Sequence, residues 1–170
     1  VLHHCLGRNK YTRLSGTSVE WDFVEAPSQI MEHWVWQTEC IEMLAIHHET
    51  GKKLNPSTIG KLKNSKNIGV GLHTLRQIGL GLEDQFLHGG NYDDPHHSLI
   101  ERAHVSPIFY PFEEVNHLAS FGHMLGGYDA GYYGYLWAEI IGDDLFSRFE
   151  EEEVLSSLVG KDYRDQILSH

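Results

Sequence analysis

Cysteine and basic side chains are scarce in this sequence, and each shortage excludes a class of protein. Only Cys5 and Cys40 occur among the 170 residues, too few for a disulfide framework and not spaced like a paired zinc-cysteine motif. A reducing compartment is therefore the default. The 13 Lys and Arg residues stand against 24 Asp and Glu residues, for a formal net charge of -11. This charge argues against nucleic acid or an anionic membrane as a partner.

Long apolar runs are also missing. No run approaches the roughly 18 residues that a membrane-spanning helix needs, while 41% hydrophobic and 22% charged residues are ordinary for a globular protein. We expect a soluble cytoplasmic protein, with mitochondria as the alternative location. The sequence has neither an initiator Met nor a recognisable targeting signal. We therefore expect the chain to be a piece of a longer protein.

No convincing β-alternation and no repeat is present, so we expect an all-α fold in a single helical domain over residues 1–170. Caps and apolar spacing set the expected elements. These are a helix at 1–6 stopped by Gly7, a loop or short extended segment at 11–19, a long helix from Asp22 to about Glu49 with Pro27 in its first turn or at a kink, a helix opened by Asn55-Pro56 to about Lys66, a helix up to His88, a turn at 89–95, a short helix through Ala103, an irregular segment at 105–115, a helix opening at Asp129, and a last amphipathic segment at 154–168.

The stretch from Phe121 to Trp137 has the composition of a binding site. In the helix that we expect to open at Asp129, Tyr132 and Tyr135 share one face, and Tyr128 lies four residues before Tyr132 at the helix entrance. The three hydroxyls should therefore point roughly one way.

Just before these tyrosines come His123 and the pair Gly126-Gly127. The two glycines allow a sharp turn or a close approach to a ligand. Two interpretations stay open on the residues alone. Either the stretch binds and polarises a polar substrate, or its tyrosines are half-buried core residues with solvated tips.

Glu25 lies near the start of the expected long helix. Taken alone, a Glu in a first helical turn complements the helix dipole, and Asp22 with Glu25 even has capping-box spacing. Its surroundings suggest more than this. The segment from Arg13 to Trp36, which contains Phe23-Val-Glu-Ala-Pro-Ser-Gln29, resembles the thimet oligopeptidase, neurolysin and oligopeptidase A family of zinc metallo-oligopeptidases.

The resemblance continues in Phe121–Trp137, in Asp144-Leu-Phe-Ser-Arg-Phe149 and in the triplet Tyr163-Arg-Asp165. It implies part of a zincin-like helical catalytic domain that hydrolyses short peptides by zinc-activated water. By resemblance, Glu25 is the third ligand of one catalytic zinc, and Glu32 at most supports the ligands from outside. A catalytic zinc keeps three protein ligands and an open position for water, which suits this role.

The resemblance also assigns roles to the tyrosine stretch. Tyr132, Tyr135 and His123 match catalytic donors to the substrate or intermediate, with Tyr135 favoured for the oxyanion. Tyr128, Gly126 and Gly127 match a flexible substrate-binding wall.

One departure from the family is large, because no His-Glu-x-x-His occurs in the chain. His33 follows Glu32 instead of preceding it, and His48-Glu49 has Lys52 where the second ligand should be. Val1-Leu-His-His4 instead resembles the sequence directly behind that motif. We expect the two missing ligands and the general base to come from the preceding part of the same protein. The isolated chain should then be inactive.

Two other functions remain possible. The chain could be a non-catalytic helical module, a degenerate or truncated homologue that binds peptides or a partner without cleavage. It could also store metal through its 13 histidines. The pairs His3-His4, His47-His48 and His96-His97 argue against storage, because adjacent helical residues point about 100° apart and cannot chelate one ion from one face.

Overall fold

The computed structural model describes residues 1–89, 105 and 117–170. Within this part the chain is mainly helical and no strand forms, although an isolated antiparallel bridge pairs Ile46 with Lys53. The expected helical fold class is confirmed. No helix within the described ranges combines the length and the apolarity that a membrane crossing requires.

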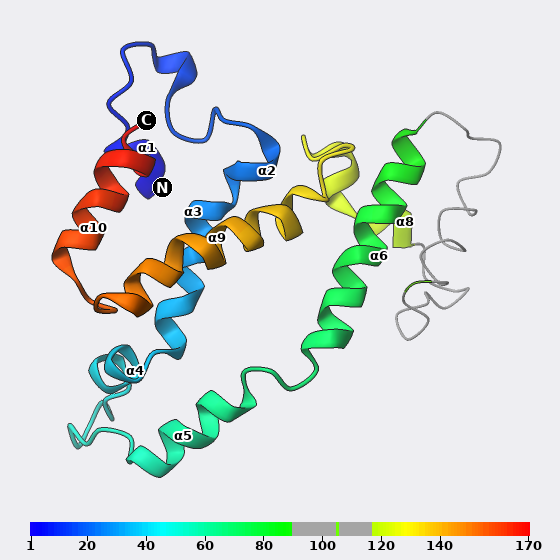
Figure 1. The fold of residues 1–170 in the computed structure, drawn as a ribbon. Helices are drawn as coiled ribbons and strands as arrows, with labels where there is room; N and C mark the ends of the chain where they lie inside the picture. Colours follow the sequence, from blue (N-terminus) through cyan, green and yellow to red (C-terminus); the bar gives the residue numbers. More distant parts are fainter. Residues whose placement is uncertain (90–104, 106–116) are drawn as a thin grey trace. The chain divides into compact units, whose positions relative to one another are not determined.

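The chain forms two compact units (Figure 1). Unit 1 comprises Val1–Ile68 and Trp137–His170, and unit 2 comprises Gly69–Leu136. The expectation of a single domain stays a prediction. The elements of unit 1 are α1 (Leu2–Leu6), η1 (Thr12–Leu14), α2 (Trp21–Val24), α3 (Ala26–Gln29), η2 (Ile30–Trp36), α4 (Thr38–Leu44), α5 (Pro56–Ser65), most of α9 (Gly134–Glu151), α10 (Ser157–Tyr163) and η5 (Arg164–Leu168). Those of unit 2 are α6 (Val70–His88), α8 (His117–Ser120), η4 (Gly122–Leu125) and the first turn of α9.

The long helix expected from Asp22 to Glu49 is wrong. The chain there breaks into α2, α3, the 3-10 helix η2 and α4, with Gln37 in an extended conformation between the last two. Pro27 lies in the first turn of α3, where its missing N–H costs nothing. Trp34 favours the break between η2 and α4, because its indole N–H donates to the carbonyl of the distant Val154 at 2.9 Å. Tertiary contacts have overridden an uninterrupted apolar pattern.

The helix starts and stops that depend on local chemistry are confirmed. α1 ends at Gly7, and α5 begins at Pro56 behind Asn55, whose side chain accepts the N–H of Thr58 at 2.8 Å. α6 runs to His88 despite its glycines. The last amphipathic segment forms α10 and η5, with Ser156 capping the former. The turn at 89–95, the short helix through Ala103 and the irregular segment at 105–115 lie almost entirely outside the described residues.

The helix expected to open at Asp129 begins at Gly134 instead. Ala130 has φ +58°, in the left-handed region, which ends any helix at that residue. The N–H groups of Ala130 and Tyr132 point to the carboxylate of Asp84 on α6, at 3.0 and 2.9 Å. A side chain far away in sequence therefore sets where α9 begins.

The core of unit 1 joins Ile30 with one side of α9 and with α10. Ile30, Phe146, Phe149 and Val159 are buried there, and Trp34 packs on them edge-on to both phenylalanine rings. α9 passes close to the chain at 26–30, because a Cβ on Gly142 would lie 3.3 Å from the backbone nitrogen of Ile30. The two termini are neighbours in this unit (Figure 1), and the N–H of Arg8 donates to the carbonyl of Ser169 at 3.0 Å.

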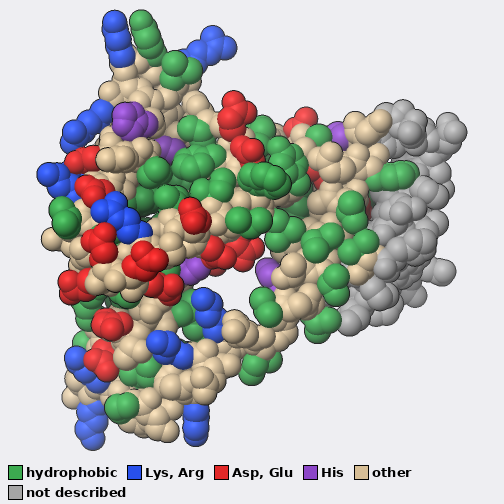
Figure 2. All heavy atoms as spheres, viewed as in Figure 1, with side chains coloured by type: hydrophobic (Ala, Val, Ile, Leu, Met, Phe, Trp, Pro, Cys, Tyr) green, Lys and Arg blue, Asp and Glu red, His purple; other side chains and the backbone are tan. Residues whose placement is uncertain are grey.

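α6 has two different faces. One face carries Gln77, Leu80 and Asp84 at helical spacing and meets the rest of unit 2. The other carries Leu72, Leu75, Ile78 and Leu82, each at least 36% exposed. Figure 2 shows hydrophobic side chains along the surface of this helix.

Candidate functional site

Glu25 lies in unit 1 at the junction of α2 and α3, where it ends the first helix and precedes the second. Its side chain is partly buried, and the hydroxyl of Ser28 donates both to Glu25 Oε2, at 2.9 Å, and to the Glu25 carbonyl, at 2.8 Å. The capping box with Asp22 does not form, because Asp22 lies inside α2 and Glu20 occupies the N-cap. Ser28 thus orients the carboxylate from within the same segment.

A complete metal site is not found in the part of the chain that the structure describes. No group of three or more His, Cys, Asp or Glu side chains there could hold an ion. His47 and His48 stack on each other with ring centroids 5.1 Å apart. His3 is buried, and this burial lowers the pKa of its imidazole. His96 and His97 lie outside the described residues.

Four of the expected site residues come together in unit 2. His123, in η4, lies edge-on to three tyrosine rings, with centroid distances of 5.5 Å to Tyr128, 5.2 Å to Tyr132 and 5.8 Å to Tyr135. The hydroxyl of Tyr135 is 3.5 Å from His123 Nε2. Tyr128 stacks on Tyr135 at 5.3 Å with an angle of 10° between the rings. The structure therefore groups three tyrosine rings around one imidazole, with the hydroxyl of Tyr135 next to its Nε2.

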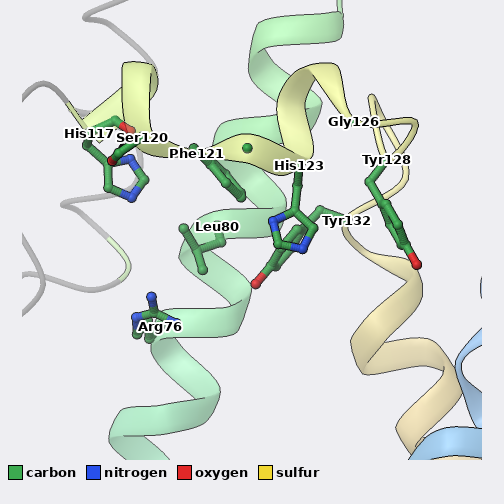
Figure 3. Close-up of a pocket in the computed structure, with 10 residues that line it drawn as sticks. Arg76, Leu80, His117, Ser120, Phe121, His123, Gly126, Tyr128 and Tyr132 are labelled. Carbon is green, nitrogen blue, oxygen red and sulfur yellow. Dashed lines mark hydrogen bonds between the residues drawn. The ribbon is translucent and has the colours of Figure 1, made fainter.

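The expectation that the three hydroxyls point one way is wrong. Tyr132 points toward α6 and Tyr128 away from it (Figure 3), and the Tyr132 hydroxyl donates to Gln77 Oε1 at 3.0 Å. The cause is the late start of α9. Because Tyr128 and Tyr132 lie in the turn before the helix, helical spacing does not apply to them.

A cavity of about 630 Å³ opens beside this cluster. Figure 3 shows side chains from α6, from the segment 117–126 and from the tyrosine turn around it. Gly126 belongs to the lining, and a Cβ there would lie 2.8 Å from the carbonyl oxygen of Gly122. Gly127 has φ +91°. The glycine pair thus makes a tight turn at the rim. The full lining is Arg76, Leu80, His117, Ser120, Phe121, Gly122, His123, Gly126, Tyr128 and Tyr132.

The electrostatics of the cluster favour neutral donors. Tyr132 is 8% exposed, and burial raises the pKa of its phenol, while the guanidinium of Arg76 and the bond to Gln77 oppose that rise. The phenol keeps its proton at neutral pH. A neutral O–H can stabilise negative charge that develops on a substrate oxygen.

The sequence prediction missed the residues of α6 that support the cluster. Asp84 is 1% exposed, and its Oδ1 lies 2.9 Å from His88 Nδ1, besides holding the two N–H groups of the tyrosine turn. Glu83 is fully buried and pairs with His117 Nδ1 at 3.2 Å. One signal was available. Acids in the middle of an apolar helix, with His88 four residues after Asp84, are typical of a buried pair.

Comparison with known proteins identifies the family. The family model described as Peptidase family M3 matches residues 1–170. Oligopeptidase A of Escherichia coli is 39% identical over 99% of this chain and 26% of its own length. Saccharolysin of Saccharomyces cerevisiae is 37% identical over 99% of this chain and 24% of its own, and the thimet-like oligopeptidase of Dictyostelium discoideum is 36% identical over 99% and 26%.

The chain thus spans about a quarter of the length of these curated relatives. The resemblance of Arg13–Trp36 and Phe121–Trp137 to the oligopeptidase family is confirmed. Because the match covers every residue, the chain belongs to Peptidase family M3.

Proposed function

We propose that this chain is the C-terminal part of the catalytic domain of a zinc-dependent oligopeptidase that hydrolyses short peptides. Family M3 is zinc-dependent, and the match to it over residues 1–170 is the observation that carries the proposal. The grouping of His123 with three tyrosines beside a cavity supports it. A cytoplasmic location stays a prediction.

This chain offers one of the ligands that a catalytic zinc ion needs. Glu25 offers a carboxylate, the kind of oxygen ligand that catalytic zinc sites combine with histidine. The hydroxyl of Ser28 on its Oε2 is the outer partner that such a ligand usually has. We assign the two remaining ligands and the general base to a preceding segment of the same protein. When bound, zinc would polarise a water molecule and a peptide carbonyl.

The residues of unit 2 would act on the substrate. A peptide carbonyl under attack gains negative charge, and donors that strengthen as this charge develops lower the barrier. Tyr135 is our choice for that donor, because its hydroxyl lies next to His123 Nε2. Tyr132, bonded to Gln77, needs only to turn its O–H from that amide to the substrate. Tyr128 and the Gly126-Gly127 turn form the wall that the peptide lies against.

The test uses the complete protein, meaning the full-length product of the gene that encodes this chain. We expect one zinc per molecule by elemental analysis and hydrolysis of a short internally quenched peptide. Glu25→Gln should lose the zinc. Its activity should fall by more than the about 10- to 100-fold that removing a hydrogen-bond partner of a metal ligand costs. Glu39→Gln, which changes an exposed carboxylate on α4, is the matched control.

Two results would contradict the proposal. Full zinc content in Glu25→Gln would remove Glu25 from the ligand set. The complete protein could instead bind the peptide without cleaving it, and that outcome would favour the non-catalytic module.

A further inference from the structure

The turn between Tyr128 and α9 contains a residue in a costly conformation. Ala130 has φ +58°, and it is the non-glycine residue with positive φ among those that the structure describes. A non-glycine residue in this region costs on the order of 1 to 3 kcal/mol and persists only when its surroundings hold it there. Glycine would adopt the same conformation at little cost.

Two consecutive residues of α6 hold Ala130 from both sides of its backbone. Gln85 Nε2 donates to the Ala130 carbonyl at 2.7 Å, and the Ala130 N–H donates to Asp84 Oδ1 at 3.0 Å. The other oxygen of Asp84 accepts the N–H of Tyr132 at 2.9 Å. The carboxylate is 1% exposed, so these bonds act in a setting where an unpaired charge would be strongly unfavourable.

The hydrogen bonds to Asp84 also position the residues proposed to act on the substrate. Tyr132 donates its N–H to Asp84, and its carbonyl accepts the N–H of Tyr135 at 3.2 Å in the first turn of α9. The position of the Asp84 carboxylate therefore sets the backbone of Tyr132 and, one bond further, that of Tyr135. An apolar side chain at position 84 could fill the same space without a buried charge. It would, however, leave the N–H groups of Ala130 and Tyr132 without this acceptor, and the turn could then change its conformation.

We propose that Asp84 and Gln85 are positioning residues, which clamp the left-handed turn at Ala130 so that Tyr132 and Tyr135 present their hydroxyls in a productive geometry. This inference rests on the proposed function for its effect on rate. The clamp itself is a property of unit 2 and can be measured without any activity.

The first test compares Asp84→Asn with Asp129→Asn in the complete protein. Asparagine keeps the shape of Asp84 but turns an amide N–H toward a backbone N–H. We expect kcat to fall on the order of 100-fold, as for a misplacement of about 1 Å, with KM within about 3-fold, because the tyrosines act on the transition state. Asp129→Asn makes the same chemical change at an exposed position of the same turn and should resemble the wild type.

The second test is a rescue. In the double variant Asp84→Asn, Ala130→Gly, the left-handed conformation at position 130 no longer depends on the hydrogen bonds of Asp84, because glycine adopts positive φ freely. We expect kcat to recover at least 10-fold over Asp84→Asn alone, which a general loss of stability would not show. Gln85→Met, which changes an exposed side chain, should give a smaller fall in kcat with the same rescue by glycine.

Hydrogen exchange at the amides of Ala130 and Tyr132 separates this inference from the proposed function. Faster exchange at both amides in Asp84→Asn, but not in Asp129→Asn, supports the clamp even if the complete protein proves not to be a peptidase. Unchanged exchange overturns it. In an active enzyme, an unchanged kcat for Asp84→Asn, or no rescue by glycine, also overturns it.

Discussion

Tyr135 has the surroundings expected of a donor whose position matters. Its ring stacks on Tyr128 and tilts against Tyr132 at 5.2 Å, and its hydroxyl approaches His123 Nε2. These neighbouring rings limit the positions that the Tyr135 hydroxyl can take. Tyr133, two residues earlier, is 44% exposed and offers the same side chain without these contacts.

Replacing Tyr135 with Phe in the complete protein should remove the O–H and leave the packing. Loss of one oxyanion donor typically costs about 2.7 to 4 kcal/mol of barrier, or roughly 10²- to 10³-fold in kcat. We expect that fall with little change in KM, measured by steady-state hydrolysis of a short peptide. Tyr133→Phe is the matched control. Equal losses in both variants, or a full rate for Tyr135→Phe, would remove Tyr135 from the proposed role.

Among the helices, α9 and α10 use glycine for opposite reasons. Gly142 is buried where α9 meets the backbone at 26–30, with the Ala26 carbonyl 3.7 Å and the Ile30 nitrogen 3.3 Å from a Cβ placed there. Gly160 lies inside α10 and has open space around the same position. The first glycine permits a close approach, whereas the second only weakens a helix.

Substitutions at these two glycines should therefore shift stability in opposite directions. Gly142→Leu should lower the free energy of unfolding by about 1 to 3 kcal/mol, because the side chain has to displace backbone. Gly160→Ala should raise it by about 0.5 to 1 kcal/mol through helix propensity. Urea unfolding followed by circular dichroism measures both changes. If Gly142→Leu were as stable as the wild type, the close packing of α9 on 26–30 would be wrong.

The helix boundaries that the sequence predicts correctly depend on residues close together in the chain. The start of α5 follows from Asn55 and Pro56 alone, because a cap and a proline at the first helical position act within one turn. The start of α9 could not be predicted, because the conformation of Ala130 depends on Asp84, 46 residues earlier. The break at η2 likewise involves Trp34 and the distant Val154.

The candidate site shows the same division. The residue types at Glu25, His123 and Tyr135 could be picked from the sequence by resemblance, and His123 does meet the tyrosines in space. The orientation of Tyr132 toward Gln77 could not, because the sequence pattern predicts a helix at Tyr132 and the chain forms a turn there. The roles assigned to all of these residues stay predictions.

The chain taken whole leaves much apolar surface in contact with water. The outer face of α6 exposes Leu72, Leu75, Ile78 and Leu82, and soluble monomers rarely expose large contiguous apolar patches. The relatives are about four times as long as the stretch that this chain matches. We therefore expect the remaining polypeptide to cover part of this face in the complete protein.

A fluorescent dye that binds apolar surface should report this difference. Per mole, the chain expressed alone should bind more dye than the complete protein. Leu75→Gln with Leu82→Gln should lower the signal of the isolated chain more than Leu14→Gln, which changes an exposed leucine in unit 1. Equal dye binding by the chain and the complete protein would contradict the expectation.

The bond between Asp84 and Ala130 also has a consequence for protein synthesis. At about 5 to 20 residues per second, the 46 residues that separate the two take roughly 2 to 9 s to translate. During that interval α6 has been synthesised, whereas the turn that it holds has not. Until then the Asp84 carboxylate has water and the nearby His88 as partners, and it accepts the N–H groups of Ala130 and Tyr132 only once the tyrosine turn has been synthesised.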